Sequence, residues 1–230
     1  MLSPLYRSIG PLGRAFGRAA AALSSLLDGL VHAWPLNEPS GTRYDVVGTA
    51  HLTDNNTVGA APGMHNDAAN LIAVNSEWLS IAATPTPVGS DWSWSFWYKD
   101  TGENYGSVIG DAQDGLKGWV LFTRNNGTVD LYCYPGPKII NVAAANGAWH
   151  HAYVELVAAT KVVSISIDNA ALVSDTLASP YADANFPFKI GKSDLASYLT
   201  GLVDEAAVWS RVLTDDERAE LLTKFYPFEE

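Results

Sequence analysis

Short apolar segments separated by turn-forming residues constrain the fold of this 230-residue chain more than any other feature. From Leu30 onward, runs of four to eleven residues rich in Trp, Tyr, Phe, Val and Ile alternate with clusters of Gly, Pro, Asn and Asp. This spacing is typical of antiparallel sandwiches and jelly rolls, because each strand is short and is followed closely by a turn. No helical pattern of useful length interrupts the series, which disfavours a βαβ architecture.

The predicted elements follow directly from this pattern. We expect Asn125-Asn126-Gly127 to form a tight hairpin, and Asp168-Asn169 to connect a second pair of strands. Thr214 followed by Glu217 forms a capping box, which predicts a short C-terminal helix that runs toward Lys224. The predicted strands are 30–36, 78–82, 92–99, 107–110, 118–123, 128–134, 139–143, 149–157, 162–167, 186–190 and 199–209.

Charge and cysteine content exclude several classes of function. The formal net charge is -11, and residues 1–30 carry a local charge of +2, so the remainder carries -13. An acidic body has no broad basic surface for phosphates, so we expect no nucleic-acid partner. The single Cys133 excludes an internal disulfide and favours folding in a reducing cytoplasm. No run reaches the roughly 20 apolar residues of a membrane-spanning helix.

Residues 1–29 differ from the rest and are predicted to form a partly helical N-terminal arm on a domain spanning 30–230. The arm is rich in Gly, Ala, Leu and Arg, and its apolar residues recur at helical spacings of three and four. We expect it to dock on another subunit; packing on its own domain and an uncleaved targeting segment are the alternatives. The residues predicted to dock are Arg7, Arg14, Phe16, Arg18, Leu23 and Leu27.

Several separated segments resemble a known superfamily. They are His32-Ala33-Trp34-Pro35-Leu36-Asn37-Glu38-Pro39-Ser40-Gly41-Thr42-Arg43-Tyr44-Asp45, Leu79-Ser80-Ile81, Trp94-Ser95-Phe96-Trp97, Gly118-Trp119, Trp149-His150-His151, Ile167-Asp168-Asn169, Ile190-Gly191 and Gly201-Leu202-Val203-Asp204-Glu205. In this order, over about residues 30–222, the chain resembles laminin-G-like domains of the concanavalin A-like jelly-roll superfamily. The resemblance implies an all-β, two-sheet antiparallel sandwich. It leaves the function open, because this fold hosts lectins, adhesion modules, glycosidases and virion parts.

The resemblance also implies a possible metal site between the first loop and the last strand. Calcium prefers oxygen ligands, and separated segments of the chain can supply them. The candidate calcium ligands are Glu38, Asp45 and Asp204. The alternative is that Asp204 or Glu205 is a structural acceptor, paired with a side chain such as Trp34, Arg43 or Arg211, since buried acids are commonly paired.

Catalysis is not expected. Glycosidases of the resembled fold carry two carboxylates at alternate positions of one strand, where both face the scissile bond. Asp204 and Glu205 are adjacent and point to opposite faces, and no predicted strand has a Glu-x-Asp pattern. His150 and His151 are adjacent too, so we expect one to be packed and the other to face solvent.

Tyr132 and Tyr134 are the predicted ligand-binding residues. They alternate with Leu131 and Cys133, so burial of that pair places both tyrosines on an open face, where they suit a sugar ring, a protein interface or merely solvent.

Together these features predict a non-enzymatic structural or attachment protein of an extracellular assembly, foremost a bacteriophage virion protein of the capsid or tail. The expected partners are other subunits, bound through the arm, and cell-surface glycans. The alternative is a glycan-binding module of a secreted or bacterial cell-surface protein.

Overall fold

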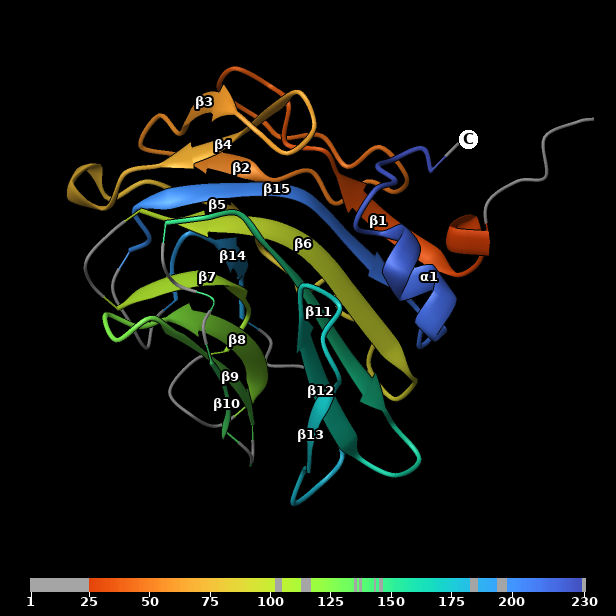
Figure 1. The fold of residues 1–230 in the computed structure, drawn as a ribbon. Helices are drawn as coiled ribbons and strands as arrows, with labels where there is room; N and C mark the ends of the chain where they lie inside the picture. Colours follow the sequence, from red (N-terminus) through yellow and green to blue (C-terminus); the bar gives the residue numbers. More distant parts are fainter. Residues whose placement is uncertain are drawn as a thin grey trace, which may run out of the picture.

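Two antiparallel β-sheets face each other and enclose the core (Figure 1). The structure is a computed structural model that describes residues 25–101, 105–112, 117–134, 136, 138–142, 144, 147–182, 186–193 and 198–228. The sandwich confirms the predicted all-β class, and its two-layer form allows alternate residues of every central strand to be buried between the sheets.

The first sheet is built around β15, which is the long C-terminal strand. Within the described residues it has eight strands, and β1 pairs with the end of β15 beyond β4. Its order is β13 (Val173–Thr176), β12 (Val162–Ile167), β11 (His150–Val157), β6 (Trp92–Asp100), β15 (Gly201–Trp209), β4 (Asp67–Leu71) and β3 (Gly59–Pro62), with β1 (Leu30–Trp34) beside β15.

The second sheet faces the first across the core. Among the described residues it has seven strands, and each pairs antiparallel with its neighbours. Its order is β10 (Lys138–Val142), β9 (Thr128–Tyr134), β8 (Gly118–Thr123), β7 (Gly106–Gly110), β14 (Phe188–Ile190), β5 (Trp78–Ile81) and β2 (Thr53–Asn55).

Aromatic rings fill the space between the sheets. The Trp34 and Trp94 rings stack with centroids 5.8 Å apart, and Phe188 of the opposite sheet stacks on Trp94 at 4.9 Å. All three side chains are fully buried, as is Trp209, which lies on the outer side of the first sheet. Large buried rings such as these dominate the energetics of a core.

A second, smaller cluster covers the outer side of the first sheet. The helix α1 (Asp215–Glu220) and the C-terminal segment lie over β15 and β1 (Figure 1). The predicted capping box is present, since Thr214 and Glu217 exchange hydrogen bonds. The helix ends at Glu220, earlier than predicted, because the next backbone bonds tighten to i→i−3 spacing at Leu222 and Thr223.

The 3-10 helix η1 (Ser25–Leu27) is fixed to this cluster by the last strand. The Trp209 indole N–H donates to the Leu26 carbonyl at 2.7 Å, and Leu26 is fully buried. The Arg211 guanidinium donates to the Ser25 and Asp28 carbonyls at 2.9 and 2.7 Å. Contacts with the jelly roll therefore begin by Ser25, ahead of the predicted boundary at residue 30.

Most predicted strands are present with small shifts of their ends, but four strands were not predicted. These are β2, β3, β4 and β13. All four lie at or beside a sheet edge. Three of them, β2, β3 and β4, are rich in Gly, Ala, Pro, Asn and Asp and lack a β-branched or aromatic alternation. Pairing with β15 and β5, and not local propensity, therefore gives β4 and β2 their extended structure.

Candidate functional site

The open face of the second sheet carries a group of aromatic side chains. Leu131 and Cys133 of β9 are buried in the core, and the alternate residues Tyr132 and Tyr134 stand half-buried on the opposite side. This is the orientation that the alternating sequence predicts. Burial raises the pKa of the Cys133 thiol above its usual range, so this cysteine is an inert core residue.

The aromatic side chains form a connected cluster, which we call the aromatic face: Tyr105, Phe122, Tyr132 and Tyr134. Phe122 is buried, and the three partly buried tyrosines pack against the cluster that contains it. Tyr132 stacks on Tyr134 with centroids 5.9 Å apart, and Phe122 meets Tyr132 edge-on at 5.4 Å. Tyr105 stacks on Phe122 at 4.9 Å. The rings hold one another in place, because each offset or edge-on contact fixes the orientation of the next ring.

Arg124 ties the aromatic face together. Its guanidinium lies 4.1 Å from the centre of the Tyr105 ring and donates to the Tyr132 hydroxyl at 3.0 Å and to Asp130 at 2.7 Å. Burial opposes its charge, but the hydrogen bond that it donates to Asp130 and the nearby phenols raise the pKa of Arg124. The guanidinium is therefore a fixed cation whose charge is neutralised locally by Asp130.

The phenols of Tyr105 and Tyr134 remain protonated at neutral pH. Burial raises the pKa of Tyr105, and burial together with the neighbouring Tyr132 raises the pKa of Tyr134. Each ring thus offers a flat apolar surface beside a hydroxyl that donates and accepts hydrogen bonds. This combination suits a ligand that has both C–H faces and hydroxyl groups.

Sequence reasoning found two members of the aromatic face and missed Tyr105, Phe122 and Arg124. Phe122 could have been found from the register of the hairpin at Asn125–Gly127, which pairs Phe122 with Asp130. With that register, Phe122 falls on the same side as Tyr132. Tyr105 has no such signal, because it lies before β7 and reaches the face only through the sheet topology.

The predicted calcium ligand Asp45 is fully used as a hydrogen-bond acceptor. It is buried, and although burial alone raises its pKa, the hydrogen bonds from Gly48 and His32 and from further backbone N–H groups lower it. Its two oxygens accept from five donors at 2.5–3.2 Å, namely His32 Nδ1 and the backbone N–H groups of Ala33, Val47, Gly48 and Ala50.

Asp204 and Glu38 are engaged in other ways. Asp204 is completely buried and accepts from the backbone N–H groups of Met64, His65 and Glu205 at 2.8–3.2 Å. Glu38 accepts from the backbone of Tyr44 at 2.7 Å. No three His, Cys, Asp or Glu side chains gather into a metal-binding group in the described part of the chain. The residues as placed therefore do not fit a shared calcium site.

The side-chain partners predicted for Asp204 and Glu205, namely Trp34, Arg43 and Arg211, were wrong. Trp34 donates to the Ala50 carbonyl, Arg43 to the carbonyls of Gly41, Val58 and Gly59, and Arg211 pairs with Glu217. Backbone N–H groups take their place at Asp204, because the turn between β3 and β4 lies directly against the last strand.

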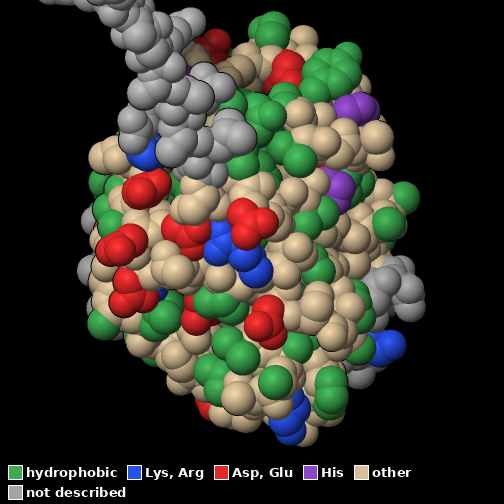
Figure 2. All heavy atoms as spheres, turned by 90° about the vertical axis from the view of Figure 1, so that its right-hand side faces the viewer, with side chains coloured by type: hydrophobic (Ala, Val, Ile, Leu, Met, Phe, Trp, Pro, Cys, Tyr) green, Lys and Arg blue, Asp and Glu red, His purple; other side chains and the backbone are tan. Residues whose placement is uncertain are grey.

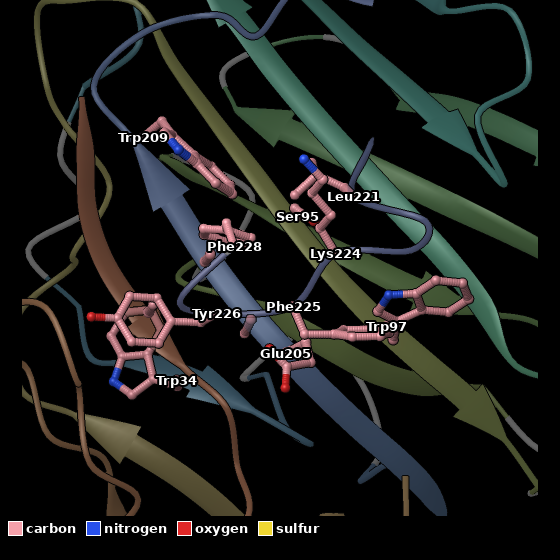
Figure 3. Close-up of a pocket in the computed structure, with 13 residues that line it drawn as sticks. Trp34, Ser95, Trp97, Glu205, Trp209, Leu221, Lys224, Phe225, Tyr226 and Phe228 are labelled. Carbon is pink, nitrogen blue, oxygen red and sulfur yellow. The ribbon is translucent and has the colours of Figure 1, made fainter. Parts of the chain in front are cut away.

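Glu205 occupies a small pocket beneath the C-terminal segment (Figure 3). A register shift of β15 between Asp204 and Ala207 gives Glu205 a φ of 49° and directs it under Phe225 and Tyr226. One carboxylate oxygen of Glu205 is buried without a hydrogen-bond partner. Burial and the neighbouring Asp204 raise the pKa of Glu205 to about 8. This carboxyl is structural, because the C-terminal segment covers it.

Both adjacent histidines are buried, so the prediction that one faces solvent was wrong. His150 Nδ1 lies 2.7 Å from Asp168 of the next hairpin, and His151 Nε2 lies 2.8 Å from the Ser95 hydroxyl. Burial lowers the pKa of His151 to about 4, which keeps its ring neutral. These contacts explain both rings as packed residues.

The residues predicted to dock on another subunit cannot be followed as a group. Arg7, Arg14, Phe16, Arg18 and Leu23 lie outside the described residues. Leu27 is described, and it packs in part against the cluster of its own domain that contains Leu26 and Trp209. For the described helices, none is both long enough and apolar enough to cross a membrane.

The face around α1 differs from the aromatic face in its charge. Figure 2 shows acidic side chains gathered here around a small basic group. Asp215, Asp216 and Glu217 form the first turn of α1, and Arg211 and Arg218 pair with two of them. These ion pairs balance the charge of both arginines, although Nε and Nη1 of Arg218 are buried without a hydrogen-bond partner.

Known structures share this fold. Domain 4 of AbnA, a GH43 extracellular arabinanase from Geobacillus stearothermophilus, in complex with arabinotriose, aligns with a TM-score of 0.66 at 20% identity, over 84% of this chain and 97% of that one. The binding domain of Paraclostridial Mosquitocidal Protein 1 aligns with a TM-score of 0.67 at 15% identity, over 84% and 52%.

A third solved structure comes from work on cell entry of botulinum neurotoxin type C through interaction with two ganglioside molecules. It aligns with a TM-score of 0.68 at 9% identity, over 87% of this chain and 52% of that one. This chain thus spans about half the length of the two toxin chains.

Comparison with curated protein sequences gave no match. A family model matches residues 74–217, which is more than half of the chain and includes β5 through β15 and the start of α1. The chain therefore belongs to the concanavalin A-like lectin/glucanases superfamily.

Proposed function

We propose that this domain is a non-enzymatic carbohydrate-binding module that binds neutral glycans on the aromatic face. The observation that carries the proposal is the arrangement of Tyr132 and Tyr134 beside Phe122, held by Arg124 on an open sheet face. Sugar rings stack their C–H surfaces on such aromatic rings, and the adjacent hydroxyls provide directional hydrogen bonds.

The charges of the aromatic face favour a neutral ligand. Arg124 is already paired with Asp130, so its cation is compensated before any ligand binds. The body of the protein is strongly acidic, with a net charge of -11 for the whole chain, and this repels anionic ligands. A neutral oligosaccharide meets neither an unpaired cation nor a net repulsion.

Hydrolysis is not part of the proposal, because the face lacks the required pair of carboxylates among its described residues. Glycosidases place two carboxyl groups about 5–9 Å apart across the scissile bond. Asp130 is the carboxylate that this face presents, and Arg124 engages it. The adjacent acids Asp204 and Glu205 belong to β15 of the other sheet and to different surroundings.

Solved structures of the same fold support a binding role without fixing the ligand. The arabinanase domain contains bound arabinotriose, and the neurotoxin structure is described by its interaction with gangliosides. We infer that this chain uses the same fold to hold a glycan, with its own aromatic face as the site.

The test is a binding titration of the full chain with neutral oligosaccharides, including arabinotriose, followed by calorimetry or NMR. Tyr134→Ala removes one ring from the face and is expected to weaken binding about tenfold, since a stacking contact is worth roughly 1–1.5 kcal/mol. Tyr134→Phe keeps the ring and is expected to have a smaller effect. Val74→Ala, at a side chain 89% exposed in the η2 turn (Ala73–Asn75), is the control. Equal binding by Tyr134→Ala and the unchanged chain contradicts the proposal.

A finer hypothesis concerns where the module works. We propose that it faces outward on an extracellular assembly, foremost a bacteriophage virion, with the residues before Ser25 docked on a neighbouring subunit; a secreted or bacterial cell-surface protein is the alternative. Ser25 is held by Arg211, so a segment preceding it starts from a fixed point. Deletion of residues 1–24 is expected to leave a folded, glycan-binding domain that no longer enters particles. Unchanged incorporation contradicts the docking role.

A further inference from the structure

A hollow distinct from the aromatic face lies at the opposite edge of the second sheet. Its volume is about 350 Å³, which is within the range of small-molecule sites. In the strand order, β7, β14 and β5 lie between β8 of the aromatic face and β2 of the hollow. The hollow is lined by His32, Thr49, Ala50, His51, Thr53, Ile81, Ala82, Ala83, Thr84 and Pro85.

Asp45 fixes the two histidines that line this hollow. His32 Nδ1 lies 2.5 Å from one Asp45 oxygen, and the backbone N–H of Asp45 donates to His51 Nδ1 at 3.1 Å. The His32 ring also stacks on Trp34 at 5.5 Å, and the His51 ring meets the edge of Tyr44 at 5.3 Å. Both imidazoles are therefore held from behind by a buried residue, which preorganises the hollow.

These hydrogen bonds determine which ring nitrogen carries the proton. Asp45 accepts at its carboxylate, so His32 must donate from Nδ1, and a neutral His32 ring leaves Nε2 as an acceptor. The Asp45 backbone N–H is a donor, so His51 Nδ1 must accept, and the neutral ring carries its proton on Nε2. Among the described residues, no hydrogen bond is found for either Nε2 atom, so one acceptor and one donor remain for a ligand.

This pattern matches a hydroxyl-rich ligand better than a metal ion or an anion. A metal requires a free lone pair on each ligating nitrogen, and the Nε2 atom of His51 carries a proton in this arrangement. The Asp45 oxygens are saturated by five donors and cannot complete a metal site. No Lys or Arg is among the described residues that line the hollow, so an anion finds no cation there.

We propose that the hollow is a second binding site, specific for a neutral saccharide residue. A sugar hydroxyl both donates and accepts, so it pairs with His32 Nε2 and with the N–H of His51. Thr49 and Thr53 add further hydroxyl partners, and Ile81 and Ala83 add apolar surface for the C–H face of the sugar. The site does not depend on the aromatic face, with which it shares no residue.

The first test reads the histidines directly. Long-range ¹H–¹⁵N NMR spectra of the full chain are expected to show the Nδ1-protonated form for His32 and the Nε2-protonated form for His51. Millimolar glucose, galactose, mannose or arabinose is expected to shift both sets of ring signals. N-acetylneuraminic acid and Zn²⁺ are expected to shift neither at comparable concentration. Opposite tautomers, no shift with any neutral sugar, or a response to Zn²⁺ or the acidic sugar alone overturns the proposal.

The second test fills the hollow. Ala82 is an exposed lining residue, so Ala82→Trp is expected to reduce the saccharide-induced histidine shifts at least about tenfold by blocking the space. Thr53→Val, which removes one hydroxyl, is expected to weaken them several-fold and keeps the test valid if Ala82→Trp fails to fold. Val74→Trp adds the same bulk outside the hollow and is expected to have no effect.

Tyr134→Ala separates the two sites. It is expected to leave the histidine shifts unchanged while it weakens binding at the aromatic face. Histidine shifts that survive both Ala82→Trp and Thr53→Val refute the hollow as a site. Histidine shifts that disappear with Tyr134→Ala refute its independence.

Discussion

Replacing Glu205 with glutamine should stabilise the protein in a pH-dependent way. Glu205 lies under the C-terminal segment with one oxygen unpartnered, and its remaining hydrogen bond comes from the Tyr226 backbone. Burial, and secondly the charge of Asp204, raise the pKa of Glu205 from its ordinary 4.5 to about 8. Glutamine has the same shape and no charge, so it removes the cost of ionising this site and little else.

The sign and size of the effect follow from proton linkage. Between about pH 4.5 and pH 8 the folded state holds the Glu205 proton more tightly than the unfolded chain, so stability falls as the pH rises. Each pH unit in this window costs about 1.4 kcal/mol, which gives an upper limit of about 5 kcal/mol above pH 8. The stabilisation by Glu205→Gln should therefore be small near pH 5, grow toward pH 8 and then level off.

Urea unfolding followed by tryptophan fluorescence at about pH 5, 7 and 9 measures this difference. Asp216→Asn is the matched control, because it removes one negative charge at an exposed position of α1. This control should show no comparable growth of its effect with pH. A Glu205→Gln effect that is constant across the range, or that destabilises the protein at high pH, would refute a protonated Glu205 in the folded state.

Three further results are expected. Gly63→Ala should lower the free energy of unfolding in urea by about 1–3 kcal/mol, because a Cβ there collides with the Asp204 carboxylate. Gly59→Ala is the control: its Cβ meets nothing within 4 Å, so it should cause no steric loss of stability. Glu217→Gln should lower the free energy of unfolding by about 3 kcal/mol at pH 7, since the bidentate bonds from Arg211 lower the pKa of Glu217 to about 2. The stability that the charged Glu217 provides is present above about pH 4.5 and is lost as the pH falls toward 2. The cost of the substitution should therefore shrink in acid. A chelator should leave the midpoint of thermal unfolding unchanged, because Glu38, Asp45 and Asp204 do not form a shared calcium site. A fall in the midpoint would show that an ion is bound and would contradict this conclusion.

The strands that could be predicted are those whose burial is written in their own sequence. The 118–123, 128–134 and 162–167 segments match β8, β9 and β12 because runs or alternations of apolar residues, bounded by turn residues such as Gly, Asn and Asp, mark the strands and their ends. The segments that became β3 and β4 contain small or polar residues, and their pairing with each other and with β15 comes from distant parts of the chain. Local sequence does not contain that information.

The candidate site was predictable to the same extent. Period-two alternation gives the side of the sheet on which Tyr132 and Tyr134 stand, because Leu131 and Cys133 must face the core. Sequence also places Asp45 in the first loop, but it does not reveal that five donors converge on its carboxylate. That convergence depends on the path of the loop through residues 45–50.

The two buried aspartates explain why an expected metal ligand can instead be a structural acceptor. A carboxylate that joins separated segments must have its charge compensated, either by a cation or by several N–H dipoles. Asp45 uses the N–H groups of its own loop together with His32, and Asp204 uses the turn that contains Met64 and His65. In both places the acid connects segments that a shared ion would also connect, and the lone pairs that would bind the ion already accept hydrogen bonds. The Asp45 carboxylate also orients His32, and its backbone N–H orients His51, so one buried acid both closes the first loop and positions the two histidines of the hollow.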